Sequence, residues 1–409
     1  MSLSLYDARR RTLVPFEPIG PRAVGLYVCG VTPYDTGHLG HAFTYVSFDV
    51  LNRYLRHLGH TVVYVQNLTD VDDDLLRRAR EVGEDYLALA ERFTDSFLAE
   101  MAALNWLPPE HFPRATRHIP HMQALVARLL ERGLAYAAAG HVYFSVDAWP
   151  SYGELSGLAR GEMLPIANER GNLPEMTGKR DPLDFVLWQP STPDEPAWPS
   201  PWGPGRPGWH IECSAMSMAY LGSRFEIHGG GADLAFPHHE SEIAQSEGAT
   251  GEGPFVSWWM HTGMLSYASE KMSKSLGNLV LVRDLLRDWS ADAIRHYLVS
   301  HHYRDELAFD AADLAASAAR VARLASAAEP HPGSRAASHV PDEPVERLRA
   351  AFLAAMDDDL DTPTALRRLD DLAELALDPA APAARRAAAG GVIRELAVPV
   401  IGLRLGTAP

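Results

Sequence analysis

Potential metal ligands stand in three short segments of this 409-residue chain. The chain has only two cysteines, Cys29 and Cys213, which are too few for a disulfide framework. His238 and Glu242 lie four residues apart, a spacing that puts both side chains on one face of a helix. Two thiols, an imidazole and a carboxylate are a plausible ligand set for zinc. The sequence therefore predicts one zinc ion per chain, and the alternative is two ordinary buried thiols beside a helical histidine and glutamate.

Another segment carries residue types that bind phosphate. Residues 38–41 read His-Leu-Gly-His, directly after a predicted strand and at the start of a predicted helix. Backbone N–H groups and the helix dipole favour an anion at such a position. Gly40 would leave room for a nucleotide, and His38 and His41 could donate hydrogen bonds to phosphate oxygens as charge develops. Taken alone, the segment is equally compatible with a pair of surface histidines.

Two lysines could act on the same phosphates. Lys271 and Lys274 lie in the sequence Lys-Met-Ser-Lys-Ser, about two thirds along the chain. Such a loop can close over bound ATP and neutralise a polyphosphate leaving group. A Lys/Ser loop is ordinarily a solvated turn, but its combination with an HxGH segment is specific. The pair resembles class I aminoacyl-tRNA synthetases, which form aminoacyl-adenylates from ATP.

Further segments are similar to the cysteine-activating branch of these enzymes, namely residues 27–30, 67–73, 206–216 and 229–240. That branch comprises cysteinyl-tRNA synthetase and mycothiol cysteine ligase, which joins cysteine to the amine of glucosaminyl-inositol. The resemblance covers nearly the whole chain and implies a zinc ion in contact with the substrate thiolate. By resemblance, the metal ligands are Cys29, Cys213, His238 and Glu242, and the residues that act on the phosphates of Mg-ATP are His38, His41, Lys271 and Lys274.

The resemblance also implies contacts to the adenylate, at Gly30, Thr32, Gly40, Thr44, Asn67, Thr69, Trp209, Gly231, Asp233, Leu265 and Lys274. Trp209 could wall the amino-acid pocket, and Asp233 could accept hydrogen bonds from ribose hydroxyls. The plainer interpretations are a core tryptophan and an aspartate at a helix start. His239 and Glu240 are expected on the surface or behind the metal ligands.

Zinc would account for the choice of amino acid. Serine differs from cysteine by one atom, and an apolar pocket discriminates poorly between such similar side chains. A borderline-soft metal prefers thiolate to hydroxyl and lowers the pKa of the thiol. In this interpretation zinc recognises the substrate and performs none of the transfer chemistry.

The acceptor of the cysteine is less clearly indicated. Phe43 and residues 31–35, 169–174, 178–182 and 278–282 are similar to the mycothiol ligase, and the anticodon-binding segment of the tRNA enzyme is not evident after the last helices. Glu242 and residues 213–216 and 241–246 are instead similar to the tRNA enzyme, and the N-terminal extension of the ligase is missing. We expect a small amino-sugar acceptor, with tRNA(Cys) as the alternative and an inactive binding paralogue as the least favoured interpretation.

Composition limits the class of protein. With 46% hydrophobic and 22% charged residues, the chain is typical of a globular protein with a large core. The N-terminus has no apolar signal region, and no apolar run reaches the roughly 18 residues that cross a bilayer. A net charge of −16 lowers the expectation of nucleic-acid binding. We expect a cytoplasmic monomer that does not bind membranes.

These residues need an α/β scaffold to bring them together. Residues 24–29 and 61–66 read as buried strands around a helix at 38–59, the unit of a parallel sheet. The expected fold is a Rossmann-like class I synthetase domain over residues 1–290, with an insertion at about 110–200, followed by a helical stem and helical bundle over 291–409. The other expected elements are a helical stretch at 74–135, strands at 141–146 and 225–228, an irregular loop at 189–208, a helix from about 238, a connection at 330–344 and two or three helices within 345–403.

Overall fold

Four parallel strands form the central sheet, in the order β10-β9-β3-β4. Their bounds are β3 (Val24–Val31), β4 (Val62–Leu68), β9 (Phe225–Gly231) and β10 (Val256–Thr262). The computed structural model describes residues 2–21, 23–34, 37–267, 270–271, 279–330 and 342–406, with the backbone alone at 267, 270 and 271. The strands predicted at 24–29, 61–66 and 225–228 are confirmed, each slightly longer than expected. Strand β10 was not predicted, although its Val-Ser-Trp-Trp sequence is rich in strand-forming residues.

The two faces of the sheet are covered by different helices. Helix α1 (Leu39–His57) packs on one face, and α6 (Trp209–Leu221) packs on the other together with α7 (Glu240–Thr250). Side chains alternate along β3, so that Leu26 and Val28 join the core beneath α1, whereas Tyr27 and Cys29 join the core beneath α6. This alternation directs the Cys29 thiol toward α6.

Helix α1 confirms the predicted helix at 38–59. His38 is its N-cap, and the helix ends at Leu58, just before Gly59, whose φ of +91° suits glycine. The strand, helix and strand from β3 to β4 form the expected unit of a parallel sheet, with β3 and β4 parallel.

A second sheet lies between β4 and β9 in the sequence and is antiparallel, in the order β5-β6-β7-β8. Its strands and flanking helices are α4 (Ile119–Glu131), β5 (Ala135–Ala138), β6 (His141–Phe144), α5 (Arg160–Glu169), β7 (Phe185–Pro190) and β8 (Gly205–Pro207). The expected strand at 141–146 is confirmed as β6. The expectation of a wholly irregular loop at 189–208 is wrong at its two ends, because β7 continues to Pro190 and β8 pairs with it as an edge strand, where a proline is tolerated.

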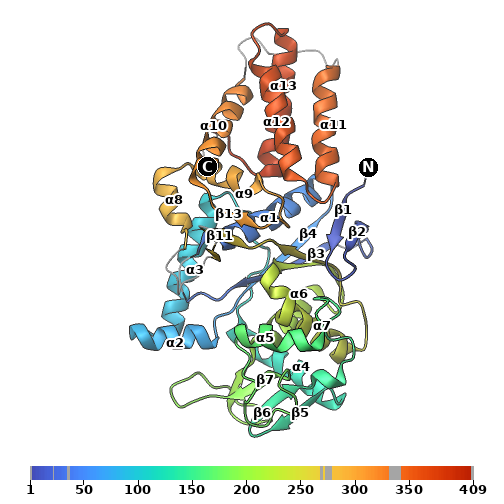
Figure 1. Cartoon of the computed structure of the whole chain (residues 1–409), viewed down its shortest axis with the longest axis vertical. Helices are drawn as coiled ribbons and strands as arrows, with labels where there is room; N and C mark the ends of the chain where they lie inside the picture. Colours follow the sequence, from blue (N-terminus) through green and yellow to red (C-terminus); the bar gives the residue numbers. More distant parts are fainter. Residues whose placement is uncertain are drawn as a thin grey trace.

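The remaining elements are a hairpin, several helices and a small sheet. They are β1 (Ser4–Asp7), β2 (Thr12–Pro15), α2 (Asp73–Val82), α3 (Tyr86–Ala103), η1 (Ala115–Arg117), η2 (Val146–Ala148), η3 (Ala232–Leu234), η4 (Ala235–His239), β11 (Leu265–Tyr267), β12 (Glu270–Lys271), α8 (Val282–Asp288), α9 (Ala291–Val299), β13 (Leu307–Ala308), α10 (Ala311–Ala328), α11 (Glu343–Asp357), α12 (Thr362–Leu377), α13 (Ala383–Leu396) and η5 (Ala397–Ile401). Helices α11 to α13 agree with the expectation of two or three helices within 345–403. In Figure 1 they stand at the end of the molecule opposite to β5, β6 and β7. Most of the predicted connection, residues 331–341, lies outside the described residues.

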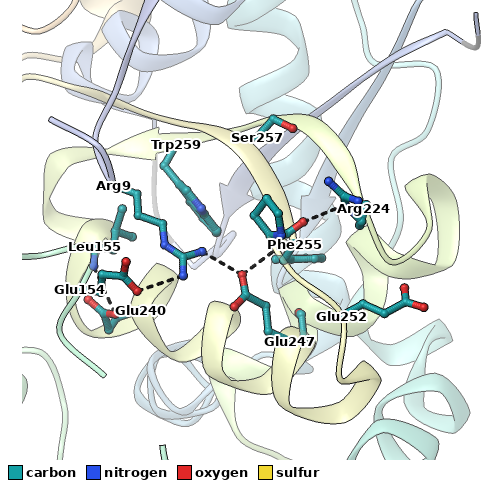
Figure 2. A network of polar contacts seen from close by, with 12 residues as sticks. Arg9, Glu154, Leu155, Arg224, Glu240, Glu247, Glu252, Phe255, Ser257 and Trp259 are labelled. Carbon is teal, nitrogen blue, oxygen red and sulfur yellow. Dashed lines mark hydrogen bonds and ion pairs between the residues drawn. The ribbon is translucent and has the colours of Figure 1, made fainter. Parts of the chain in front are cut away.

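The loop of the β1–β2 hairpin binds to the region of the second sheet (Figure 2). The Arg9 guanidinium donates to Glu247 on α7 at 2.8 Å and to Glu154, in the turn before α5, at 3.0 Å. Glu247 also accepts a hydrogen bond from the backbone N–H of Phe255 at 3.0 Å. One arginine thus links the N-terminal hairpin, α7 and the start of β10. Within the described residues, the helices are too short or too polar to cross a bilayer.

Candidate functional site

The four predicted metal ligands come together on the α6 side of the central sheet. Cys29 lies near the carboxyl end of β3, Cys213 on α6, His238 in η4 and Glu242 in the first turn of α7. The Cys29 Sγ atom is 3.7 Å from Cys213 Sγ and 3.7 Å from Glu242 Oε1. His238 Nε2 is 3.3 Å from Glu242 Oε1. All four ligand atoms lie within 4.8 Å of one another, as a shared metal ion would require.

These ligands are almost completely buried, which changes their ionisation. Burial raises the pKa of Cys29 well above its usual value, and the neighbouring Cys213 thiol raises it further. Burial also raises the pKa of the Glu242 carboxyl and lowers the pKa of His238, in both cases far from the usual value. The thiolate and the carboxylate are stabilised in these charged, metal-binding forms only when a cation is present, whereas the lowered pKa of His238 keeps its ring in the neutral form that binds a metal.

Three histidines outside the predicted set surround the cluster. His228 Nε2 is 3.0 Å from Glu242 Oε2, so the carboxylate is held with its other oxygen toward the thiols. His210 Nδ1 is 2.9 Å from His238 Nδ1, and His261 Nε2 is 2.9 Å from His239 Nδ1. The contacts of His228 and His210 lie behind candidate metal ligands, and contacts of this kind fix the orientation of the ligands.

Sequence reasoning missed His210, His228 and His261. A signal was present for His261, which lies near the carboxyl end of a parallel strand, where α/β proteins place their sites, whereas His228 lies in the middle of β9. His239 and Glu240 are buried, so the surface alternative for them is wrong. His239 Nε2 lies 3.3 Å from Cys29 Sγ, and Glu240 accepts hydrogen bonds from the backbone and side chain of Ser156.

The phosphate-binding candidates His38 and His41 lie at the N-terminus of α1. The His38 ring caps the helix by accepting a hydrogen bond from the His41 N–H at 3.4 Å. The two rings stack with their centroids 3.8 Å apart. A Cβ atom at Gly40 would lie 2.9 Å from His38 Nδ1, so the space left by this glycine is needed by the His38 ring. Gly40 also lines a large cavity, so the expectation that a nucleotide approaches it stays a prediction.

One large cavity, with a volume of about 820 Å³, lies beside these residues, and Cys29 alone of the four metal-ligand candidates lines it. The predicted adenylate contacts that line it are Gly30, Thr32, Gly40, Thr44, Trp209, Gly231, Asp233 and Leu265. Cys29, His38 and His41 line the same cavity. The Trp209 ring stacks on the ring of the metal-ligand candidate His238, with centroids 4.2 Å apart, so it connects the cavity wall with the metal cluster.

Asn67 and Thr69 do not line this cavity, in contrast to the expectation. The Asn67 side chain accepts a hydrogen bond from the Gly30 N–H at 2.8 Å and donates to Thr69 Oγ1 at 3.2 Å. Both residues are buried behind Gly30 because β4 approaches β3 closely there. A Cβ atom at Gly30 would lie only 1.6 Å from the Asn67 carbonyl oxygen. From this position they hold the backbone at Gly30, next to Cys29, in place.

The two lysines of the Lys-Met-Ser-Lys-Ser segment cannot be located in the same way. Lys271 belongs to the two-residue strand β12, which pairs with β11, and its side chain is not described. Lys274 lies outside the described residues. Strand β11, with which Lys271 pairs through β12, begins at Leu265, a residue of the cavity wall.

Comparison with known families matches residues 15–319 to the model of the "tRNA synthetases class I (C) catalytic domain". The chain belongs to this family. The resemblance seen in the sequence motifs is thereby confirmed, as is the Rossmann-like α/β fold of a class I synthetase.

Relatives of this class I synthetase have two different names. The cysteine–tRNA ligase of Alkalilimnicola ehrlichii is 50% identical over 372 residues, which cover 91% of this chain and 79% of the relative. The L-cysteine:1D-myo-inositol 2-amino-2-deoxy-alpha-D-glucopyranoside ligase of Thermomonospora curvata is 46% identical over 395 residues, which cover 95% of this chain and 92% of the relative. Both relatives are ligases, and the present synthetase is a ligase as well.

Solved structures support the fold of the synthetase independently. A methionyl-tRNA synthetase of Mycobacterium tuberculosis in complex with methionyl-adenylate superposes with a TM-score of 0.69. The match covers 94% of this chain and 92% of the other at 16% identity, so it concerns the fold alone.

Proposed function

We propose that this synthetase is a cysteine ligase that uses Mg-ATP to form cysteinyl-AMP and then transfers the cysteinyl group to the amine of glucosaminyl-inositol. The observation that carries the first half is that Cys29, one of four candidate metal ligands whose ligand atoms lie within 4.8 Å of one another, lines the same cavity as His38 and His41. A cysteine bound there has its thiol at the metal cluster and its carboxylate toward the phosphate-binding histidines.

The donor set fits zinc. His238 Nε2 is buried, faces Glu242 Oε1 and makes no hydrogen bond within the described residues, as expected of an atom reserved for a metal. Cys29, Cys213, His238 and Glu242 would hold the ion. A bound zinc ion would favour a thiolate over a hydroxyl and so select cysteine against serine.

The residues of the chain then carry out adenylate formation by position and charge. The cysteine carboxylate attacks the α-phosphorus of ATP, and His38 and His41 stabilise the charge that develops on the phosphate oxygens. Lys271 and Lys274 neutralise the departing pyrophosphate. Trp209 forms a wall of the amino-acid pocket beside His238, and Asp233 accepts hydrogen bonds from the ribose hydroxyls. This reaction requires no side-chain nucleophile.

The residues that line the cavity favour a small molecule as the acceptor of the cysteinyl group. Residues 169–174 and 178–182 resemble the mycothiol ligase, and Arg170, Asn172 and Lys179 from these segments line the cavity. Sites for small ligands commonly measure about 300–1,000 Å³, so a cavity of about 820 Å³ can hold an adenylate with a small acceptor beside it. These polar side chains suit a hydroxyl-rich amino sugar.

Transfer to tRNA(Cys) is the second candidate. It is supported by the 50% identity with a cysteine–tRNA ligase and by Glu242, which completes the metal set typical of the tRNA enzyme. The net charge of −16 argues against it, because the overall field repels an RNA backbone.

The test gives the zinc-loaded protein ATP and cysteine and measures exchange of labelled pyrophosphate into ATP. Glucosaminyl-inositol and tRNA(Cys) are then offered side by side, and the cysteinylated products are separated and counted. We expect cysteine-dependent exchange and the amide of glucosaminyl-inositol. Cysteinyl-tRNA as the sole product would overturn the acceptor proposal, and the absence of exchange would leave a binding protein without ligase activity.

A further inference from the structure

Lysine is rare in this protein, and its positions are informative. Of the 37 basic residues, 34 are arginines and three are lysines. Lys271 and Lys274 belong to the phosphate-binding segment, and the third is Lys179. Arginine serves at every other basic position, but a guanidinium cannot lose its proton in a protein, whereas a lysine in a desolvated site can. A position that keeps lysine in such a chain therefore points to a role for a neutral or titrating amine.

Lys179 lies in the loop between α5 and β7 and lines the large cavity. Its Nζ atom donates to Asn172 Oδ1 at 2.5 Å and lies 3.5 Å from the carbonyl oxygen of Pro182. Asn172 lines the cavity too, so the amine and its partner face the same space.

The loop around Lys179 is fixed to the second sheet. The next residue, Arg180, donates its backbone N–H to the hydroxyl of Tyr136 at 2.8 Å. The Tyr143 hydroxyl donates to the carbonyl of Thr177 at 2.9 Å. A lysine held on both sides in this way presents its amine at a defined place.

The surroundings of Lys179 favour the neutral amine. Burial lowers its pKa to about 8, and the carboxylates of Asp184 and Asp181 oppose this only in part. Both carboxylates have other partners, since Asp184 accepts from the Tyr136 hydroxyl and the Val146 N–H, and Asp181 pairs with Arg160. Lys179 forms no ion pair with a carboxylate of the described residues.

His210, on α6, interacts electrostatically with Lys179. Burial lowers the pKa of His210 to about 3, and the charge of Lys179 makes a smaller contribution to this shift. An imidazole with so low a pKa stays neutral and adds no charge to the lysine's surroundings near neutral pH. Lys179 is thus a half-buried amine that is partly neutral at physiological pH.

We infer that Lys179 is the proton acceptor for the amine that attacks cysteinyl-AMP. This inference rests on the proposed transfer to an amine. The amine nitrogen forms a bond to the carbonyl carbon, the bond from that carbon to the phosphate oxygen breaks, and AMP leaves with the electron pair. The proton released by the nitrogen passes to the neutral Nζ of Lys179, which becomes an ammonium group and later returns the proton to water.

Other groups on the cavity wall suit this role less well. Burial raises the pKa of Asp72 to about 6, but its carboxylate caps α2 by accepting from the Asp74 N–H at 2.8 Å. The Arg170 guanidinium donates to the backbone carbonyls of Asp233 and Phe236 and remains charged. His210 is hydrogen bonded to the metal-ligand candidate His238.

The experiment compares the wild type with Lys179→Met, which removes the amine, and Lys179→Arg, which keeps a cation that cannot act as a base. Arg180→Met is the matched control, because the exposed Arg180 is adjacent and packs on the Tyr136 ring at 3.9 Å. Cysteinyl-AMP is formed first, and a single turnover of transfer to glucosaminyl-inositol is timed at several acceptor concentrations. Pyrophosphate exchange is measured on each protein.

We expect both Lys179 variants to lower the transfer rate at saturating acceptor by about 100-fold, the lower range for loss of a general base, relative to their exchange rate. The ratio of wild-type to Lys179→Arg transfer rates should rise with pH through about 8, because the acceptor's own ionisation is common to both proteins. A ratio independent of pH, or equal loss of exchange and transfer, would overturn the inference. A wild type that forms cysteinyl-tRNA alone would overturn the proposed function and this inference together, whereas normal amide formation by Lys179→Arg would overturn only the inference.

Discussion

At the scale of single residues, Cys213 is the most direct test of the metal cluster. Its Sγ lies 3.7 Å from Cys29 Sγ and 3.7 Å from Asn67 Oδ1. A serine at this position keeps a hydrogen bond to Asn67 but is a poor ligand for a borderline-soft metal. We expect Cys213→Ser to lower the zinc content of the purified protein and its preference for cysteine over serine together, measured by metal analysis and by pyrophosphate exchange with each amino acid.

Ser217→Ala is the matched control for that substitution. Ser217 lies on the same helix one turn later and donates its hydroxyl to the carbonyl of Cys213 at 2.7 Å, away from the metal cluster. It should retain zinc and selectivity. Full zinc occupancy in Cys213→Ser would remove this cysteine from the ligand set.

The convergence of the four candidate metal ligands could be predicted from the sequence because each stands in a recognisable motif. The side chains that hold them could not, since His228, His210 and His261 come from β9, α6 and β10 and meet only after the sheet has formed. Asn67 and Thr69 show the opposite error. Their motif predicted contacts with the nucleotide. In the structure β4 approaches Gly30 closely, and both residues lie behind Gly30 and do not line the cavity.

At the scale of elements, the sequence pattern predicted those strands and helices that carry a clear local signal, such as a continuous apolar run or a recognisable cap. Strand β3 is buried along nearly its whole length, and α1 has a clear cap and end. Strands β5 and β8 were not predicted because their few residues become strands only by pairing with β6 and β7. Short edge strands of this kind depend on a partner that the local sequence does not reveal.

Helix α3 carries a buried carboxyl group that makes stability depend on pH. Glu100 accepts from Ser96 Oγ at 3.3 Å, and burial raises its pKa to about 7. Because the folded pKa lies above the unfolded value, the carboxyl costs no stability at low pH and costs progressively more as pH rises from about 4.5 to about 7. Glu100→Gln should therefore be more stable than the wild type at pH 8, by about 1 kcal/mol, and the difference should shrink toward pH 5.

Thermal unfolding at pH 5, 6.5 and 8 measures this effect. Asp95→Asn, an exposed position on the same helix, is the control and should leave the pH dependence of stability as it is in the wild type. A stability difference for Glu100→Gln that is the same at all three pH values would show that folding does not raise the pKa of this carboxyl.

At the scale of the whole molecule, the helix that begins with the candidate phosphate-binding histidines is connected to the C-terminal helices by a buried ionic network. Asp49 on α1 pairs with Arg295 on α9 and accepts from Arg53 Nε at 2.8 Å. Arg295 also donates to the carbonyls of Ile401 at 2.6 Å and Leu104 at 2.9 Å. One side chain thus joins α1, α9, the end of α3 and the last helical turn of the chain.

We expect Asp49→Ala to destabilise the protein by about 3–5 kcal/mol, because it leaves two buried guanidinium groups without a counter-charge. The matched control is Glu395→Ala, which breaks a surface ion pair with Arg349 at 2.6 Å. The side chains of Arg349 and Glu395 are 34% and 43% exposed, and a pair this exposed contributes about 1 kcal/mol or less to stability. Urea denaturation followed by tryptophan fluorescence and by circular dichroism gives both values. The network links the sheet to the helical bundle, so the two signals should coincide in the wild type and separate in Asp49→Ala. A loss no larger than that of the surface control would mean that apolar packing alone holds α1 against the C-terminal helices.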